Sequence, residues 1–241
     1  MTSTGPKTSA ISIIIPTRNE AENLDRLLPR LLAQPGLEII VVDGGSTDRT
    51  VACAERHNVL VVSTPPGRGN QQNRGAALAS REVLLFLHAD TLLPDDFAAQ
   101  VQAVLNLPRT AAGAFRLRID APEWGFRCIE WGANLRSRLC GLPYGDQAIF
   151  VRRQTLQLAG GVPEQPILED VALLRRLKRF GRIRIAPARV TTSARRWQRL
   201  GLVRTTLCNQ LLLLGSLCGI QARTLHQLYT RQDGKARREQ H

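Results

Sequence analysis

Apolar runs separated by helical patterns organise the first half of the chain. Residues 11–16, 37–43, 59–63 and 83–87 are short runs rich in Ile, Val and Leu, and leucines recur at helical spacing between the first two runs. Runs that are apolar at successive positions are typical of strands buried on both faces. Strands that alternate with helices predict an α/β fold built on a parallel sheet with helices on its faces.

Polar side chains follow these strands directly. Thr17 to Glu20 come after the first run, Asp43 and Gly44 end the second, and His88-Ala89-Asp90 end the run at 83–87. The carboxyl ends of parallel strands meet at one edge of a sheet, where ligands bind. Strand alternation places His88 and Asp90 on the same side, and an acid there can hold a divalent cation that offsets a diphosphate. The alternative is that Asp90 only caps a helix or occupies a turn.

A glycine-rich polar connection covers residues 65–75 and leads into a helix that ends near Ser80. Arg68, Gln71 and Asn73 in this connection can present a guanidinium and amides to a phosphate or a base. The connection matches neither G-x-G-x-x-G nor the P-loop pattern, which disfavours a Rossmann dinucleotide site and a P-loop. An ordinary solvated linker is the alternative.

The second half predicts helices at about 94–107 and 124–139, strands at 112–119 and 148–152, and an amphipathic helix that begins at Glu169. Asp146 and Gln147 lie in the turn-rich loop before the strand at 148–152, and are candidate site residues or turn residues. Glu169 and Asp170 are adjacent carboxylates that either stabilise the helix dipole or supply a general base.

Positive charge is concentrated in the second half. The chain of 241 residues has a net charge of +13, yet residues 1–100 hold 9 Lys and Arg against 11 Asp and Glu. Residues 174–204 contain eleven Lys or Arg and no acid, with Arg195-Arg196-Trp197 within the run. Such a run is either a solvated face or the binding surface for an anionic partner such as lipid headgroups or phosphates. We expect no nucleic-acid partner.

The segment 202–220 is long enough to span a membrane, but Arg204, Asn209 and Gln210 argue against a span. We expect an amphipathic helix that lies on the domain, on a partner or on a bilayer surface. The N-terminus lacks the apolar core of a signal peptide, and the five cysteines show no metal-binding spacing. These features predict a cytoplasmic protein, either free or peripheral on the inner face of the membrane, and they leave a homo-oligomeric state open.

A series of motifs points to one family. The motifs are S-I-I-I-P-T-R-N-E, V-V-D-G-G-S-T-D, G-R-G-N-Q-Q-N-R-G-A, F-L-H-A-D-T-L-L-P, P-Y-G-D-Q and L-E-D-V. In this order and spacing, over about Ser12 to Trp197, the chain resembles glycosyltransferase family 2, the inverting enzymes of GT-A fold. The last motifs resemble a bacterial subgroup of small proteins, some labelled arsenosugar-type glycosyltransferases.

The resemblance implies a GT-A fold with a mixed, mostly parallel sheet, flanking helices and a C-terminal amphipathic helical segment. It implies a catalytic domain at 11–200, and we expect a disordered arm at 1–10, a helical appendage at 201–232 and a frayed tail at 233–241.

The resemblance also implies roles for individual residues. The donor nucleotide would contact residues that follow the first two strands and residues of the polar connection: Pro16, Thr17, Asn19, Glu20, Asp43, Gly44, Arg68, Gln71, Asn73 and Ala89. His88-Ala89-Asp90 occupies the D-x-D position, so Asp90, with His88 as a second candidate ligand, would bind Mn²⁺ or Mg²⁺. Asp170, with Glu169 beside it, stands in the place of the catalytic base. The acceptor or the diphosphate would contact Asp146, Gln147, Arg196 and Trp197.

Two departures from the family pattern refine this interpretation. His88 replaces the first carboxylate of D-x-D, which leaves one fewer anionic oxygen for the metal. Ser193 stands where the Q-x-x-R-W motif of processive members has glutamine. The second departure favours transfer of one sugar over polymer synthesis.

The resulting hypothesis is metal-assisted transfer of one sugar from a nucleotide-sugar donor to an acceptor hydroxyl with inversion, with Asp170 as general base. The basic and apolar C-terminal segments suggest a lipid-linked acceptor or a membrane surface. Two alternatives remain open: nucleotidyl transfer to a sugar phosphate, and a non-catalytic binder of anionic membrane surfaces.

Overall fold

The computed structural model describes residues 11–227 and 229. The arm expected at 1–10 and the tail expected at 233–241 lie outside these residues, so the proposed division of the chain stays a prediction. The described strands are β1 (Ile11–Thr17), β2 (Glu38–Asp43), β3 (Leu60–Ser63), β4 (Val83–Phe86), β5 (Thr91–Leu92), β6 (Thr110–Asp120), β7 (Phe150–Arg152) and β8 (Arg182–Ser193). The helices are α1 (Ala21–Leu32), α2 (Thr50–Arg56), α3 (Arg68–Leu78), α4 (Phe97–Leu105), α5 (Trp124–Cys140), α6 (Arg153–Leu158), α7 (Glu169–Leu177), α8 (Arg195–Leu200) and α9 (Leu202–Leu217), with a 3₁₀ turn η1 (Gly145–Gln147).

One eight-stranded sheet of the described residues has the order β3-β2-β1-β4-β7-β6-β8-β5. β1 pairs in parallel with β2 and β4, β2 with β3, and β6 with β8. β7 runs antiparallel to β4 and β6, and β5 antiparallel to β8. The sheet is therefore mixed and mostly parallel, and the expected fold class is confirmed.

Helices cover both faces of the sheet, which explains the uninterrupted apolar runs. Ile13 and Ile15 of β1 face a core cluster shared with α1, α2 and α4, whereas Ile14 faces a second cluster with α6 and α7. Each of these side chains is fully buried. Since successive strand residues point to opposite faces, a strand covered on both sides must be apolar at every position.

Close packing of α3 on β1 requires a glycine. A Cβ on Gly75 would lie 2.4 Å from Cγ2 of Ile14, well inside van der Waals contact. The glycine-rich character of this segment thus belongs partly to helix-to-sheet packing.

Two boundaries differ from the sequence-based expectations. α3 begins at Arg68, so most of the connection expected at 65–75 is helical. The basic run contains β8, a twelve-residue strand that pairs with β6 along nearly its whole length. The sequence pattern does not reveal this strand, because alternate arginines on a half-exposed strand resemble a solvated charged run.

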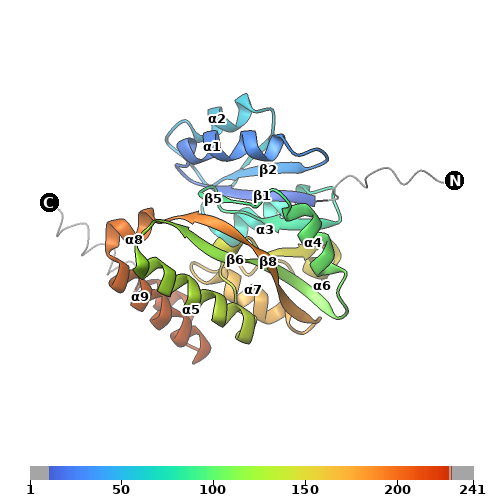
Figure 1. Ribbon diagram of the computed structural model, residues 1–241. Coiled ribbons are helices and arrows are strands. Elements are labelled where there is room, and N and C mark those ends of the chain that lie inside the picture. Colours follow the sequence, from blue (N-terminus) through green and yellow to red (C-terminus); the bar gives the residue numbers. More distant parts are fainter. Residues whose placement is uncertain (1–10, 228, 230–241) are drawn as a thin grey trace.

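α5, α8 and α9 lie beyond β6 and β8, on the side of the molecule opposite α1 and α2 (Figure 1). Phe126 of α5 packs edge-on against Trp197 of α8, with ring centroids 6.3 Å apart. α9 contributes Leu213 to a cluster with Val171 and Leu174 of α7. Within residues 11–227 and 229, no helix combines the length and the apolar character needed to cross a bilayer, which agrees with the expectation for 202–220.

Glu38, the first residue of β2, links the segment before β4 to the start of β1. Its carboxylate accepts hydrogen bonds from the backbone N–H and the hydroxyl of Ser80, both at 2.8 Å, and from the hydroxyl of Ser12. Partial burial alone would raise the pKa of this carboxyl, but the hydrogen bonds prevail and hold it below its usual value.

We predict that Glu38→Gln lowers the free energy of unfolding by about 1–2 kcal/mol at neutral pH, because the replaced acceptor is charged and half-exposed. A depressed pKa stabilises the fold above the unfolded-state pKa, and this contribution is lost as pH falls through the folded-state pKa. Denaturant unfolding at several pH values should therefore show wild type and variant converging as pH falls below the ordinary pKa of a glutamate. Glu55→Gln, which removes an exposed carboxylate from α2, is the control and should show no such convergence.

Candidate active site

Two cavities meet at the carboxyl ends of β1 and β4. The β1 cavity, of about 350 Å³, is lined by residues after β1, by the start of α3 and by the turn after β4. The α7 cavity, of about 340 Å³, is lined by the η1 loop, the start of α7, the α8 region and α9. Arg68, His88 and Asp90 line both cavities, so the two form one continuous candidate site.

The β1 cavity contains six of the predicted donor-binding residues: Pro16, Thr17, Glu20, Arg68, Gln71 and Ala89. Gln71 also has a structural task, since its amide donates to the carbonyl oxygens of Thr17 at 2.9 Å and Val42 at 2.8 Å. These bonds satisfy two strand-end carbonyls and fix the distance between β1 and β2 where they meet the cavity.

The other predicted donor residues have structural partners and do not line either cavity. Asp43 accepts from the backbone N–H groups of Gly45 and Ser46, both at 3.0 Å. Asn73 exchanges two 2.8 Å bonds with the backbone of Val162. The backbone N–H of Gly44 donates to the carbonyl of Thr17 at 2.9 Å.

Asn19 also takes a structural place. Its carboxamide oxygen accepts from the N–H of Thr47 at 2.8 Å, and its backbone adopts a positive φ of 57°. Asn19 does not cap α1, because this helix begins at Ala21 and its N-cap residue is Glu20. The four residues of this and the preceding paragraph shape the loops around the β1 cavity.

His88, Ala89 and Asp90 lie in a turn beyond the end of β4, not on the strand itself. The alternation argument for His88 and Asp90 is therefore wrong, although both residues line both cavities. Burial, together with the nearby Arg68 guanidinium, lowers the pKa of His88 to about 3. At neutral pH His88 is an uncharged imidazole with a nitrogen lone pair available to a ligand.

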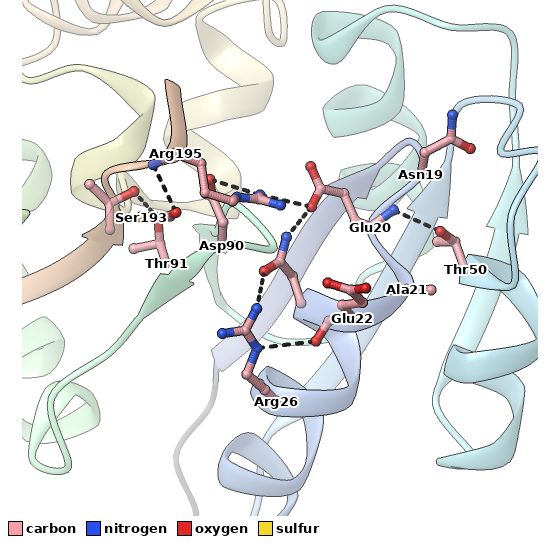
Figure 2. A network of polar contacts seen from close by, with 12 residues as sticks. Asn19, Glu20, Ala21, Glu22, Arg26, Thr50, Asp90, Thr91, Ser193 and Arg195 are labelled. Carbon is pink, nitrogen blue, oxygen red and sulfur yellow. Dashed lines mark hydrogen bonds and ion pairs between the residues drawn. The ribbon is translucent and has the colours of Figure 1, made fainter. Parts of the chain in front are cut away.

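Arg195 connects the C-terminal part of the chain to this turn. Its guanidinium lies 3.4 Å from a carboxylate oxygen of Asp90 and 3.3 Å from one of Glu20, as Figure 2 shows. The backbone N–H of Ser193 donates to the carbonyl of Asp90 at 3.1 Å. Sequence reasoning missed this function of Arg195, since one arginine in a long basic run carries no signal of its own.

The α7 cavity contains the carboxylate pair expected at the base position. Oδ2 of Asp170 accepts from the N–H of Gly145 at 2.6 Å, and Oδ1 accepts from the N–H of Val171 at 2.7 Å. Glu169 is buried and lies 3.7 Å from the Arg68 guanidinium. Burial raises the pKa of both carboxyls, and in Glu169 the charge of Asp170 adds to the effect. A carboxylate whose pKa is raised is a stronger base.

Gly145 lets the η1 loop approach these groups. A Cβ at this position would lie 2.9 Å from Nε2 of His88 and 3.5 Å from Oδ2 of Asp170. A side chain there would separate the two groups and fill the junction of the cavities.

Asp146 and Gln147 are adjacent but play different roles. Asp146 lines the α7 cavity, and burial raises the pKa of its carboxyl to about 6, with like charge from Asp170 adding to the shift. Gln147 is fully buried outside both cavities and bonds with the carbonyl of Phe115 at 2.8 Å and the hydroxyl of Ser137 at 2.8 Å. The expected acceptor contact therefore fits the position of Asp146, whereas Gln147 supports the loop.

Arg196 and Trp197 line the α7 cavity as well. Trp197 is buried against α5, and Arg196 lies over the ring of Tyr229 with 5.1 Å between the guanidinium carbon and the ring centroid. Tyr144 and Asn209, which sequence reasoning did not single out, line the same cavity, and the Tyr144 hydroxyl donates to the Asn209 carbonyl at 3.3 Å. Burial raises the pKa of Tyr144 to about 12, so it remains a hydroxyl donor at neutral pH.

Among the described residues, two sets of side chains could ligate a metal ion. Asp25, Cys53 and His57, from α1, α2 and the residue after α2, have ligand atoms within 4.8 Å of one another, but they line neither cavity. Asp25 there already pairs with Arg56 at 2.7 Å, and burial with the Asp25 contact raises the pKa of Cys53 to about 11, which keeps a protonated thiol. At the cavities the candidate donors are the neutral imidazole of His88 and the carboxylate of Asp90, which also lies 3.4 Å from the Arg195 guanidinium.

Comparison with known proteins identifies the family of the chain. The family described as Glycosyl transferase family 2 matches residues 12–153, more than half of the chain. The chain belongs to glycosyl transferase family 2.

Two mycobacterial relatives show the extent of the similarity. The chain is 38% identical over 155 residues to the PGL/p-HBAD biosynthesis glycosyltransferase of Mycobacterium tuberculosis, covering 59% of this chain and 59% of the relative. It is 35% identical over 137 residues to an uncharacterized glycosyltransferase of the same organism, covering 54% of this chain and 62% of the relative. The matched region thus spans about three fifths of the length of these relatives.

Solved structures share the fold. A mannosyltransferase from Pyrobaculum calidifontis, in complex with GDP-Man and Mn²⁺, superposes with a TM-score of 0.68 at 19% identity, covering 90% of this chain and 68% of that one. Glucosyl-3-phosphoglycerate synthase from Mycobacterium tuberculosis, in complex with Mn²⁺, UDP and glucosyl-3-phosphoglycerate, gives a TM-score of 0.63 at 23% identity, covering 91% and 88%. The chain therefore has the GT-A fold expected from its motifs.

We predict that Gln147→Ala destabilises the protein by roughly 2–4 kcal/mol, because it removes the buried side-chain hydrogen bonds to the Phe115 carbonyl and the Tyr144 N–H and leaves a cavity. The thermal midpoint should fall by about 4–12 °C. Gln154→Ala, at an exposed position of α6, is the matched control. An unchanged midpoint for Gln147→Ala would contradict the supporting role assigned to this side chain.

Asp146→Asn should stabilise the protein, in contrast to Gln147→Ala. A raised folded-state pKa means that wild type is most stable below the unfolded-state pKa and loses stability as pH rises through about 6. The amide does not ionise, so the variant should gain about 1–3 kcal/mol over wild type at pH 8 and little at pH 4. Thermal melts across this range test the prediction, and a variant that is less stable than wild type at pH 8 would refute it.

Proposed function

We propose that this glycosyltransferase moves one sugar from a nucleotide-sugar donor to an acceptor hydroxyl with inversion, assisted by a divalent metal. The observation that carries the proposal is the junction of the two cavities at Arg68, His88 and Asp90. A donor in the β1 cavity would place its diphosphate at this junction. Its sugar would then point toward Asp170 in the α7 cavity.

The donor set at the junction fits Mn²⁺ or Mg²⁺. Asp90, with a partly exposed carboxylate, and His88, with a neutral imidazole, would hold the ion. When bound, the ion offsets negative charge on the departing diphosphate. The Mn²⁺ complexes of the two structural neighbours described above support this part of the proposal.

Asp170 acts as the general base. Two backbone N–H groups hold its oxygens in place, and its raised pKa strengthens it as a proton acceptor. It takes the proton of the acceptor hydroxyl while the oxygen attacks the anomeric carbon opposite the nucleotide. Arg68 stands at the junction with a charge that stabilises the leaving diphosphate, and buried Glu169 orients this guanidinium.

The α7 cavity would receive the acceptor. Its wall combines polar groups, Tyr144 and Asn209, with the apolar Leu212. Asn209 and Leu212 belong to α9, so the acceptor would enter beside this helix. A lipid-linked acceptor remains our expectation for a cavity bounded in this way.

Donor binding can be tested directly by thermal shift. UDP, GDP, dTDP and CDP, each with and without Mn²⁺, should include one nucleotide that raises the melting temperature in a Mn²⁺-dependent manner, because a ligand that binds the native state stabilises it. Asp90→Asn should abolish the Mn²⁺ dependence, whereas Asp95→Asn, at an exposed position before α4, should retain it. Equal stabilisation of Asp90→Asn and wild type by Mn²⁺ would remove Asp90 from the metal site.

Asp170→Asn should reduce turnover of the matching nucleotide sugar by about 10²–10⁴-fold, the usual contribution of a general base. The nucleotide-induced thermal shift should remain, since the variant keeps the shape of the side chain. Asp120→Asn, at the exposed end of β6, is the control. Wild-type turnover in Asp170→Asn would assign the base role to another group.

A further inference from the structure

Exposed apolar stripes run along two neighbouring helices, α5 and α9, and we refer to the two stripes together as the α5–α9 face. The helices touch near their first residues, where a Cβ on Gly125 would lie 3.2 Å from Leu202. Figure 1 shows them at the end of the molecule opposite α1 and α2. On α5 the exposed stripe consists of Trp124, Cys128, Trp131, Leu135 and Leu139. On α9 it consists of Val203, Leu207, Leu211, Leu214 and Leu217.

Both stripes follow the helical repeat, so each is a continuous line along its helix. Trp124 is 79% exposed and Trp131 is 69% exposed, although buried tryptophan is the rule in soluble domains. The opposite side of α9 packs inward through Leu212 and Leu213. Apolar residues on both sides of a helix need a second apolar environment outside the protein.

The charge around this α5–α9 face identifies the environment. Between Asp170 and Asp233 the sequence contains thirteen Lys or Arg and no acid. Arg138 and Arg204 are exposed on the two helices themselves. The acid within α5, Glu130, is buried and pairs with Arg127 at 2.9 Å, while the exposed Glu123 precedes the helix.

We propose that the α5–α9 face docks on an anionic lipid bilayer surface. Trp, Leu and Val side chains enter the boundary between headgroups and acyl chains, and the flanking arginines contact anionic headgroups. A second copy of this chain would instead bring two arginine-bearing, acid-poor surfaces together. Trp197 of the R-R-W motif is buried, so the exposed tryptophans of this region are Trp124 and Trp131 of α5.

Docking of this face would orient the candidate site. α9 contributes Leu211 and Leu214 to the face and, from its other side, Asn209 and Leu212 to the α7 cavity. If the proposed function holds, an acceptor anchored in the same bilayer reaches the cavity along α9. The docking itself requires neither donor nor acceptor.

Vesicle co-sedimentation without any substrate tests the proposal. Wild type should bind to vesicles that contain phosphatidylglycerol in phosphatidylcholine. It should bind much less to vesicles of phosphatidylcholine alone. Trp131→Gln and Leu211→Gln should each weaken binding by about tenfold, since each removes an apolar side chain that would enter the bilayer. Leu158→Gln is the matched control, because Leu158 on α6 is 65% exposed and Leu211 is 63% exposed.

A second pair of variants distinguishes electrostatic attraction to anionic headgroups from insertion of apolar side chains. Arg138→Gln should weaken binding to anionic vesicles by about fivefold, as expected for loss of one surface arginine, whereas Arg30→Gln on α1 should not. Tryptophan emission of wild type should shift to the blue on binding, and this readout stands even if a variant fails to fold.

Three results would overturn the proposal. These are absence of wild-type binding to anionic vesicles, equal binding by Leu211→Gln and Leu158→Gln, and a wild-type dimer that Leu211→Gln dissociates. If Leu211→Gln dissociates a wild-type dimer, the partner of this face is a second copy of the chain and not a bilayer. Since the assay contains no donor, failure of docking and failure of the proposed sugar transfer are distinguishable.

Discussion

The position of β1 inside the sheet is the constraint on which the site depends. β1 is covered on both faces by apolar clusters and hydrogen-bonded on both sides to parallel neighbours, so its backbone and side chains have no freedom to shift. Its last residues, Pro16 and Thr17, line the β1 cavity. Their position relative to the turn after β4 is therefore fixed. The amide of Gln71 completes this arrangement by pairing the carbonyl of Thr17.

The second half of the chain brings its carboxylates to that fixed edge through polar contacts between segments far apart in sequence. Gly145 donates to Asp170 across 25 positions, and Arg195 reaches Asp90 across 105. Such contacts are short, buried or charge-assisted, and each depends on a loop that is itself tied down, as Gln147 ties the η1 loop to Phe115. The candidate site is thus assembled from two halves that share few apolar side chains at the junction.

The sequence predicted the fold and the order of the site motifs because burial leaves a readable pattern. β1, β2 and β4 are continuous apolar runs, and polar residues follow each of them. The sequence could not predict which of these polar residues line the cavities. Asp43, Asn73 and Gln147 satisfy backbone groups, and their residue types are the same whether the partner is a peptide or a ligand. β8 was missed because its arginines alternate with apolar residues on a half-exposed strand, and charge concealed the alternation.

The near-absence of acids after Asp170 has a consequence for how the protein responds to acidity. Guanidinium groups keep their proton at any pH compatible with folding, so the arginine charge over the C-terminal half is constant between mildly acidic and mildly alkaline conditions. The carboxyls of Asp146, Glu169 and Asp170, each with a raised pKa, line the α7 cavity. Acidification therefore protonates these carboxyls inside the site while the arginine charge outside it stays the same.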